Sequence, residues 1–137
     1  MFFKKEKNMK ENDDLIKVAA LLIHAAKIDE NYSNQEEKII KQALLKIGAN
    51  DKNIEKIMNG GNEIEENSNQ ILDFTKEVKS MNNENKLKII ETLWRIIYSN
   101  KEANMYETSL MRRLGGLLYI DSKIMGDIKN KIKKESL

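Results

Sequence analysis

The stretch that decides the fold is Val18–Ile40, "VAALLIHAAKIDENYSNQEEKII". It opens with a run that is apolar up to Ala26, passes through a cluster of acidic, amide and hydroxyl side chains, and then begins a second amphipathic pattern. The first part is apolar on nearly every side, so it predicts a central, buried helix. The polar cluster is typical either of a turn between two helices or of a site that binds a ligand.

Outward from this stretch, the hydrophobic periodicity predicts an all-α chain of about seven helices in a compact bundle, with no strand. Glycine and short polar residues set the expected ends. Gly60-Gly61 is expected to end the third helix, and the acidic segment after it is expected to be a loop. Gly115-Gly116 indicates either close packing against a neighbouring helix or a local break. The expected helices cover about 13–26, 33–47, 51–60, 68–80, 84–98, 105–119 and 122–133.

The chain also repeats itself when its first half is aligned with its second half at an offset of 71 residues, the distance from Glu36 to Glu107. In this repeat register Leu22 falls on Leu93, and Glu36 falls on Glu107. Such self-similarity predicts two copies of one helical hairpin unit around a shared core. We expect repeat one over about 13–60, a linker helix over about 68–80 and repeat two over about 84–133, all within a single domain that spans 13–137.

Composition excludes several classes of function. The 137 residues include no proline, which suits a helical chain, and no cysteine, which excludes disulfides, thiolate nucleophiles and thiolate-bound metals. The net charge of +2 gives no convincing indication of nucleic-acid binding. No apolar run is long enough for a membrane span, and the expected location is the cytoplasm. Residues 1–12 are expected to form a flexible basic tail. The basic C-terminal segment is either a solvated helix end or a weak contact for a membrane surface.

Both copies of the repeat place a glutamate seven residues after a polar turn residue, Glu36 after Asp29 and Glu107 after Asn100. An apolar helix, an acid-bearing turn and a glutamate in the next helix resemble the TerB family, which includes tellurite-resistance proteins and the N-terminal domain of a DnaJ-type co-chaperone. The second copy carries the closer likeness, through Leu93-Trp94, Tyr106-Glu107 and Arg112-Arg113. The resemblance implies an all-helical fold and a divalent-cation site that would use Asp29, Glu36 and Glu107.

A local explanation for the glutamates competes with that site. Ser33 and Glu36 have the spacing of a capping box, and Asn104 and Glu107 form a close analogue. A calcium loop that started at Asp29 would require glycine and glutamate where the chain has asparagine and isoleucine, so an EF-hand is excluded. Glu36 and Glu107 are therefore helix caps alone, caps that also bind a cation or a partner, or residues of a dedicated binding site.

No arrangement of a nucleophile and a base is visible, and the single histidine, His24, is expected at the edge of the core. Trp94 and Tyr98 are expected to be core aromatics, and Arg112-Arg113 either a solvated face or a contact for an anionic partner. We therefore expect no enzyme, but an interaction or scaffold module with an unidentified protein partner, and the resemblance to the TerB family implies a link to stress response. The alternative is a weak divalent-metal binder or sensor. The sequence does not determine an oligomeric state.

Overall fold

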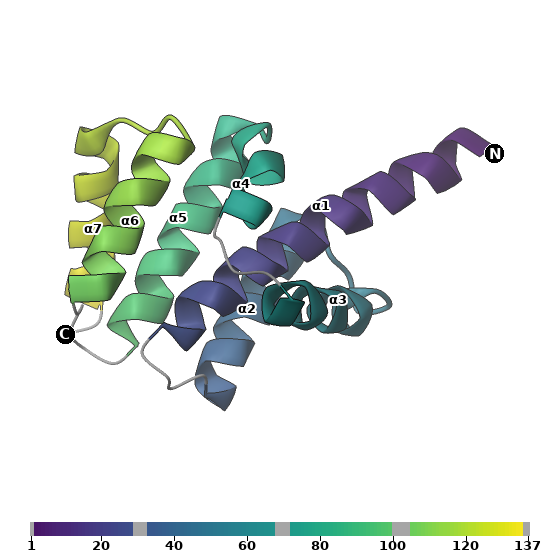
Figure 1. The fold of residues 1–137 in the computed structure, drawn as a ribbon, viewed down its shortest axis with the longest axis horizontal. Helices are drawn as coiled ribbons and strands as arrows, with labels where there is room; N and C mark the ends of the chain where they lie inside the picture. Colours follow the sequence, from purple (N-terminus) through teal and green to yellow (C-terminus); the bar gives the residue numbers. More distant parts are fainter. Residues whose placement is uncertain (1, 29–32, 68–71, 100–104, 136–137) are drawn as a thin grey trace.

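The structure is a computed structural model that describes residues 2–28, 33–67, 72–99 and 105–135. These residues form seven α-helices and no strand, which confirms the predicted all-α fold. Figure 1 shows α5, α6 and α7 side by side, with the long α1 crossing the molecule beside α2 and α3. The helices are α1 (Phe2–Lys27), α2 (Asn34–Ile47), α3 (Ile54–Asn67), α4 (Leu72–Lys79), α5 (Asn83–Tyr98), α6 (Met105–Leu117) and α7 (Ser122–Glu135).

The core is centred on the C-terminal half of α1 and on α5. Every residue from Val18 to Ile23 is completely buried, and α1 packs against α2, α3, α4 and α5. On α5, Ile89, Ile90, Leu93 and Ile97 are completely buried as well. The predicted central helix is thus confirmed. Its all-round apolar surface is explained by the number of helices that surround it.

The prediction that the third helix ends at Gly60-Gly61 was wrong, because α3 continues to Asn67. These glycines instead allow α3 to approach α1 closely. A Cβ atom on Gly61 would lie 2.7 Å from the Cβ of Ala19 and 3.1 Å from the backbone nitrogen of Ala20. Residues 62–67, the described part of the segment expected to be a loop, therefore continue α3 along α1, where the Glu65 carboxylate accepts a 2.9 Å hydrogen bond from Lys27 Nζ.

The expected start of the first helix was also wrong. The sequence predicted a tail over residues 1–12 and a helix from about Asp13, whereas α1 begins at Phe2. Asn12 and Asp13 have the side chains of an N-cap, but the residues before them are largely lysine, glutamate and methionine, which have high helix propensity. The polar pair therefore lies inside a longer helix.

Two pairs of helix ends agree with the predicted internal repeat, while the starts of α1 and α5 and of α3 and α7 do not correspond. In the repeat register, the last residue of α1, Lys27, falls on the last residue of α5, Tyr98. The first residue of α2, Asn34, falls on the first residue of α6, Met105. Burial follows the same register, since both members of each of the following pairs are buried: Val18 and Ile89, Leu22 and Leu93, Ala26 and Ile97, Ile40 and Met111, and Ile54 and Met125.

The C-terminal ends of α2 and α6 share one hydrogen-bond geometry. Ala49 N–H donates to the Leu44 carbonyl at 2.9 Å, and Ile120 N–H donates to the Gly115 carbonyl at 2.9 Å, which is the equivalent bond in the repeat register. Between donor and acceptor, Gly48 has a φ of 144° and Tyr119 a φ of 56°. Both helices therefore end through a residue with positive φ, a conformation that glycine adopts without strain and tyrosine rarely adopts.

Candidate functional site

The first predicted site residue, Glu36, is a helix-capping residue in the structure. Ser33 Oγ accepts a hydrogen bond from Glu36 N–H at 3.3 Å, and Glu36 Oε1 accepts one from Ser33 N–H at 3.3 Å. Glu36 Oε1 also accepts a hydrogen bond from Ser33 Oγ at 3.2 Å. This is the reciprocal capping box that the spacing of the two residues predicts, and it buries the glutamate at the start of α2.

Its repeat partner Glu107 is buried at the equivalent position of α6. The pKa of Tyr98 lies above its usual value, first because burial disfavours the tyrosinate and then because the negative Glu107 repels it. The other predicted ligand, Asp29, and the predicted capping residue, Asn104, lie outside the described residues. Among the residues that are described, no three histidine, aspartate or glutamate side chains gather as a metal site. The cation site remains a prediction.

His24 connects α1 to two other helices. Its Nδ1 lies 3.5 Å from Glu65 Oε1 on α3, and its ring lies 5.8 Å from the ring of Phe74 on α4. The side chain is partly exposed, which agrees with the expected position at the edge of the core. His24 and Lys27 of α1 both contact the Glu65 carboxylate of α3, so His24 has a structural role in holding α3 against α1.

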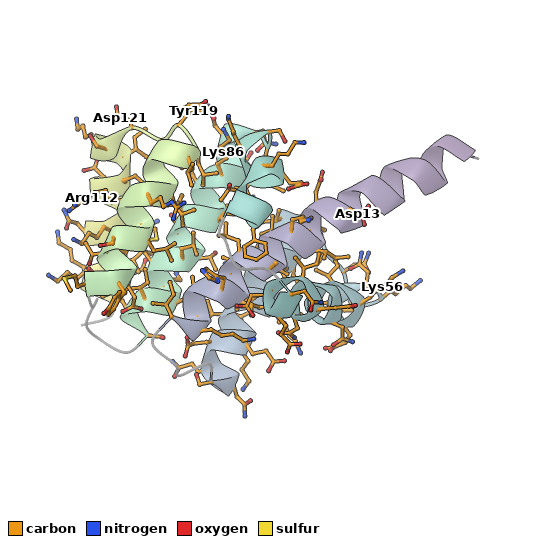
Figure 2. The ribbon with its side chains drawn as sticks, in the orientation of Figure 1. Asp13, Lys56, Lys86, Arg112, Tyr119 and Asp121 are labelled. Atoms are coloured by element: carbon orange, nitrogen blue, oxygen red, sulfur yellow. The ribbon has the colours of Figure 1, made fainter. Side chains whose placement is uncertain are left out.

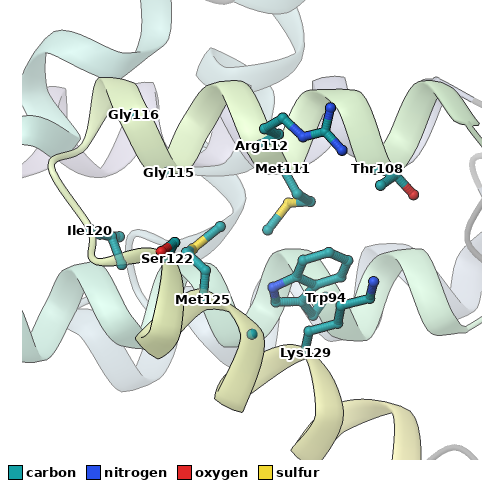
Figure 3. A pocket seen from close by; sticks show the side chains of 11 residues that line it. Trp94, Thr108, Met111, Arg112, Gly115, Gly116, Ile120, Ser122, Met125 and Lys129 are labelled. Carbon is teal, nitrogen blue, oxygen red and sulfur yellow. The ribbon is translucent and has the colours of Figure 1, made fainter.

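A cavity of about 420 Å³ lies between α5, α6 and α7 (Figure 3). Residues spaced by three or four positions supply its walls, which is the spacing of one helix face. Thr108, Met111, Arg112, Gly115 and Gly116 come from α6, and Ser122, Met125, Gly126 and Lys129 come from α7. Trp94 of α5 and Ile120 complete the lining, and no acidic residue is part of it.

The glycine pair of α6 lies in this wall. The helix continues through Gly115 and Gly116, so the alternative of a local break is wrong. A Cβ on Gly115 would lie 3.4 Å from the Met125 side chain, whereas a Cβ on Gly116 would meet no atom within 4 Å. Gly115 therefore packs against α7, while Gly116 leaves open space beside the cavity.

Trp94 is the buried aromatic wall of the cavity. Only 4% of its surface is exposed, and its ring stacks on Tyr98 with 5.9 Å between the ring centroids, as expected for core aromatics at this spacing. Its indole Nε1 is buried and has no hydrogen-bond acceptor among the described residues. A buried donor without an acceptor costs about 1–3 kcal/mol. Figure 3 shows this nitrogen on the edge of the ring that faces Met111 and Met125.

Two cations flank the tryptophan. Lys129 Nζ lies over the indole, 5.6 Å from the ring centroid, and Arg112 lies on α6 at the rim of the cavity. The sequence analysis singled out Arg112 and Trp94 separately. It did not identify Lys129, which belongs to the basic C-terminal segment. The only available signal was its spacing of seven residues from Ser122, which places both on one face of α7.

No helix in the described ranges is both long enough and apolar enough to cross a bilayer.

Comparison with known proteins identifies the family. A search of curated proteins and a search of solved structures gave no match. The family model described as "Tellurite resistance protein TerB" matches residues 15–130, which include all of α2 to α6, half of α1 and most of α7. On this match, and in agreement with its seven helices, the chain belongs to the TerB family.

Proposed function

We propose that this TerB-family chain is a non-catalytic interaction module of a stress-response system, and that its partner is a protein with an acidic surface. The outer face of α6 carries the proposal. Met105 and Tyr106 at the start of this helix are 74% and 71% exposed, although large apolar side chains are usually covered.

The charge on this face has one sign. Arg112 and Arg113 are exposed on α6, while the one acidic residue of the helix, Glu107, is buried. Figure 2 places Arg112 at the outer edge of the group formed by α5, α6 and α7. Methionine, tyrosine and arginine are enriched at protein interfaces, and the positive charge selects an acidic partner.

Photocrosslinking in the organism that makes the protein tests this proposal. A photoreactive p-benzoylphenylalanine takes the place of Tyr106 in one variant and of Lys56 in the control variant. Lys56 is also exposed but lies on α3, far from α6 in Figure 2. We expect one discrete adduct from position 106 in cells exposed to tellurite, and we expect the exchange Arg113→Glu to reduce its yield because it reverses a charge at the interface.

The proposal is wrong if positions 106 and 56 give the same adducts, or if Arg113→Glu leaves the adduct at position 106 unchanged. Circular dichroism of both variants provides the control for folding. Arg113 does not line the cavity, so this exchange tests the outer face alone.

The alternative function is a weak divalent-metal binder or sensor that uses the turns before α2 and α6. It is supported by the burial of Glu36 and Glu107 at equivalent positions of α2 and α6, which places one carboxylate at the start of each helix. Calorimetry with calcium, magnesium, manganese and zinc tests it. A saturable heat that is lost in Glu107→Gln would support the site, and the absence of heat with all four ions would reject it.

A further inference from the structure

We propose that the cavity between α5, α6 and α7 binds a small organic anion with an apolar body, such as a medium-chain carboxylate. The volume of about 420 Å³ falls within the range of small-molecule sites. The inference rests on this cavity, and Arg112 is the residue that it shares with the outer face of α6.

The charges around the cavity select an anion. Arg112 and Lys129 approach it from two different helices, and none of its lining residues is acidic. Ser122 adds a hydroxyl group that can donate a hydrogen bond. A carboxylate accepts hydrogen bonds only, and bonds between a carboxylate and a cationic donor are the stronger kind.

The unpaired indole N–H identifies where an acceptor belongs. Trp94 is 4% exposed, its Nε1 has no acceptor among the described residues, and the atom faces the cavity in Figure 3. The nitrogen is covered by its neighbours, so an acceptor in the cavity would reach it after a shift of the flexible Met111 or Met125 side chain. A carboxylate that enters the cavity would supply this acceptor.

The remaining walls suit an apolar body. Met111, Met125 and Ile120 supply flexible or aliphatic surface, and methionine adapts to ligands of different shape. A Cβ on Gly126 would meet no atom within 4 Å, so this part of α7 leaves room where most residues would place a side chain. A larger residue at this position would fill the space that the ligand needs.

The chain contains a single tryptophan, so the fluorescence of Trp94 reports on this cavity alone. The probe is octanoate, titrated below the concentration at which it forms micelles, and octylammonium is the matched probe with the same tail and the opposite charge. We expect a saturable change in emission with octanoate and none with octylammonium. Calorimetry of the same titrations gives the dissociation constant independently of fluorescence.

Variants assign the binding to the cavity. Arg112→Gln and Lys129→Gln each remove one cation and should weaken octanoate binding about tenfold, the effect of losing one charge-assisted contact. Gly126→Leu should abolish binding and leave the circular dichroism spectrum unchanged. Arg113→Glu, next to Arg112 but outside the cavity, should change the affinity less than about fivefold, since exposed charges interact weakly in water.

Four results would overturn the inference. They are the absence of saturable octanoate binding at millimolar concentration, equal binding of octylammonium, unchanged binding in a folded Gly126→Leu variant, and binding of an acidic peptide such as acetyl-Asp-Leu-Phe-amide without any binding of octanoate. The last result would assign the cavity to a protein ligand. Failure of octanoate alongside a positive crosslink at Tyr106 would leave the proposed function standing.

Discussion

Gly61→Ala tests the contact that holds α3 against α1. The added methyl carbon would lie 2.7 Å from the Cβ of Ala19, and the next two atoms, at 3.1 and 3.2 Å, belong to the backbone of Ala20 and Ala19. None of these atoms can rotate away, so the two helices must separate. Overpacking of this kind costs about 1–3 kcal/mol, and the rigid neighbours place the cost in the upper half of that range.

Gly116→Ala is the matched control. It also lies inside a helix, but a Cβ there meets no atom within 4 Å. Gly61→Ala gains about 1 kcal/mol of helix propensity in the middle of α3, whereas Gly116, next to the last residue of α6, gains at most that amount. We therefore expect Gly61→Ala to be less stable than Gly116→Ala by about 1–3 kcal/mol, or roughly 3–12 °C in Tm for a chain of this length.

Chemical denaturation followed by circular dichroism and by tryptophan fluorescence measures the difference. Ala19→Gly removes the nearest methyl group, so Gly61→Ala should cost less in that background than it does alone. Equal stability of Gly61→Ala and Gly116→Ala would refute the close approach of α3 to α1. So would an Ala19→Gly background in which the cost of Gly61→Ala is unchanged.

Three further predictions concern the helix ends and Tyr98. Gly48→Ala should lower the free energy of unfolding by about 1–3 kcal/mol, because φ is 144° at this position, and a variant as stable as the parent in urea denaturation would contradict this. Glu36→Ala should lower the free energy of unfolding by about 0.5–2 kcal/mol, and Glu36→Gln should lower it by less than half as much, because glutamine can complete the same capping box. Equal losses for the two variants in thermal melts would contradict the capping role of Glu36. The raised pKa of Tyr98 means that the folded state holds this proton more tightly than the unfolded state, so the free energy of unfolding should fall as the pH rises above about 10. In Tyr98→Phe, the free energy of unfolding measured by denaturation should fall less steeply between about pH 9 and about pH 11. The same exchange should remove the last component of the tyrosinate absorbance titration. An unchanged dependence of the free energy of unfolding on pH would show that Tyr98 is not the group responsible.

The sequence was sufficient for features that depend on neighbouring residues. The Ser33–Glu36 capping box involves side chains within one helical turn, and it is present in the structure as predicted. The repeat was also visible in the sequence, and the ends of α1 and α5, the starts of α2 and α6 and several buried positions agree with it. Local chemistry and periodicity were therefore enough for the fold class.

Features that depend on distant residues were missed. Gly60-Gly61 has the local pattern of a helix end, and only the presence of Ala19 and Ile16 on another helix explains why the helix continues there. In the same way, the cavity needs Trp94, Arg112 and Lys129 from three helices, and no short motif connects them. Such sites depend on how the helices pack, which periodicity alone does not specify.

The most direct test of the duplicated fold is an experimentally determined structure whose two halves are superposed. We predict that α1 and α2 overlay α5 and α6 in the repeat register, with Lys27 on Tyr98, Glu36 on Glu107 and Gly48 on Tyr119. A best superposition in any other register, or helix pairs that cross at clearly different angles in the two halves, would contradict the duplication.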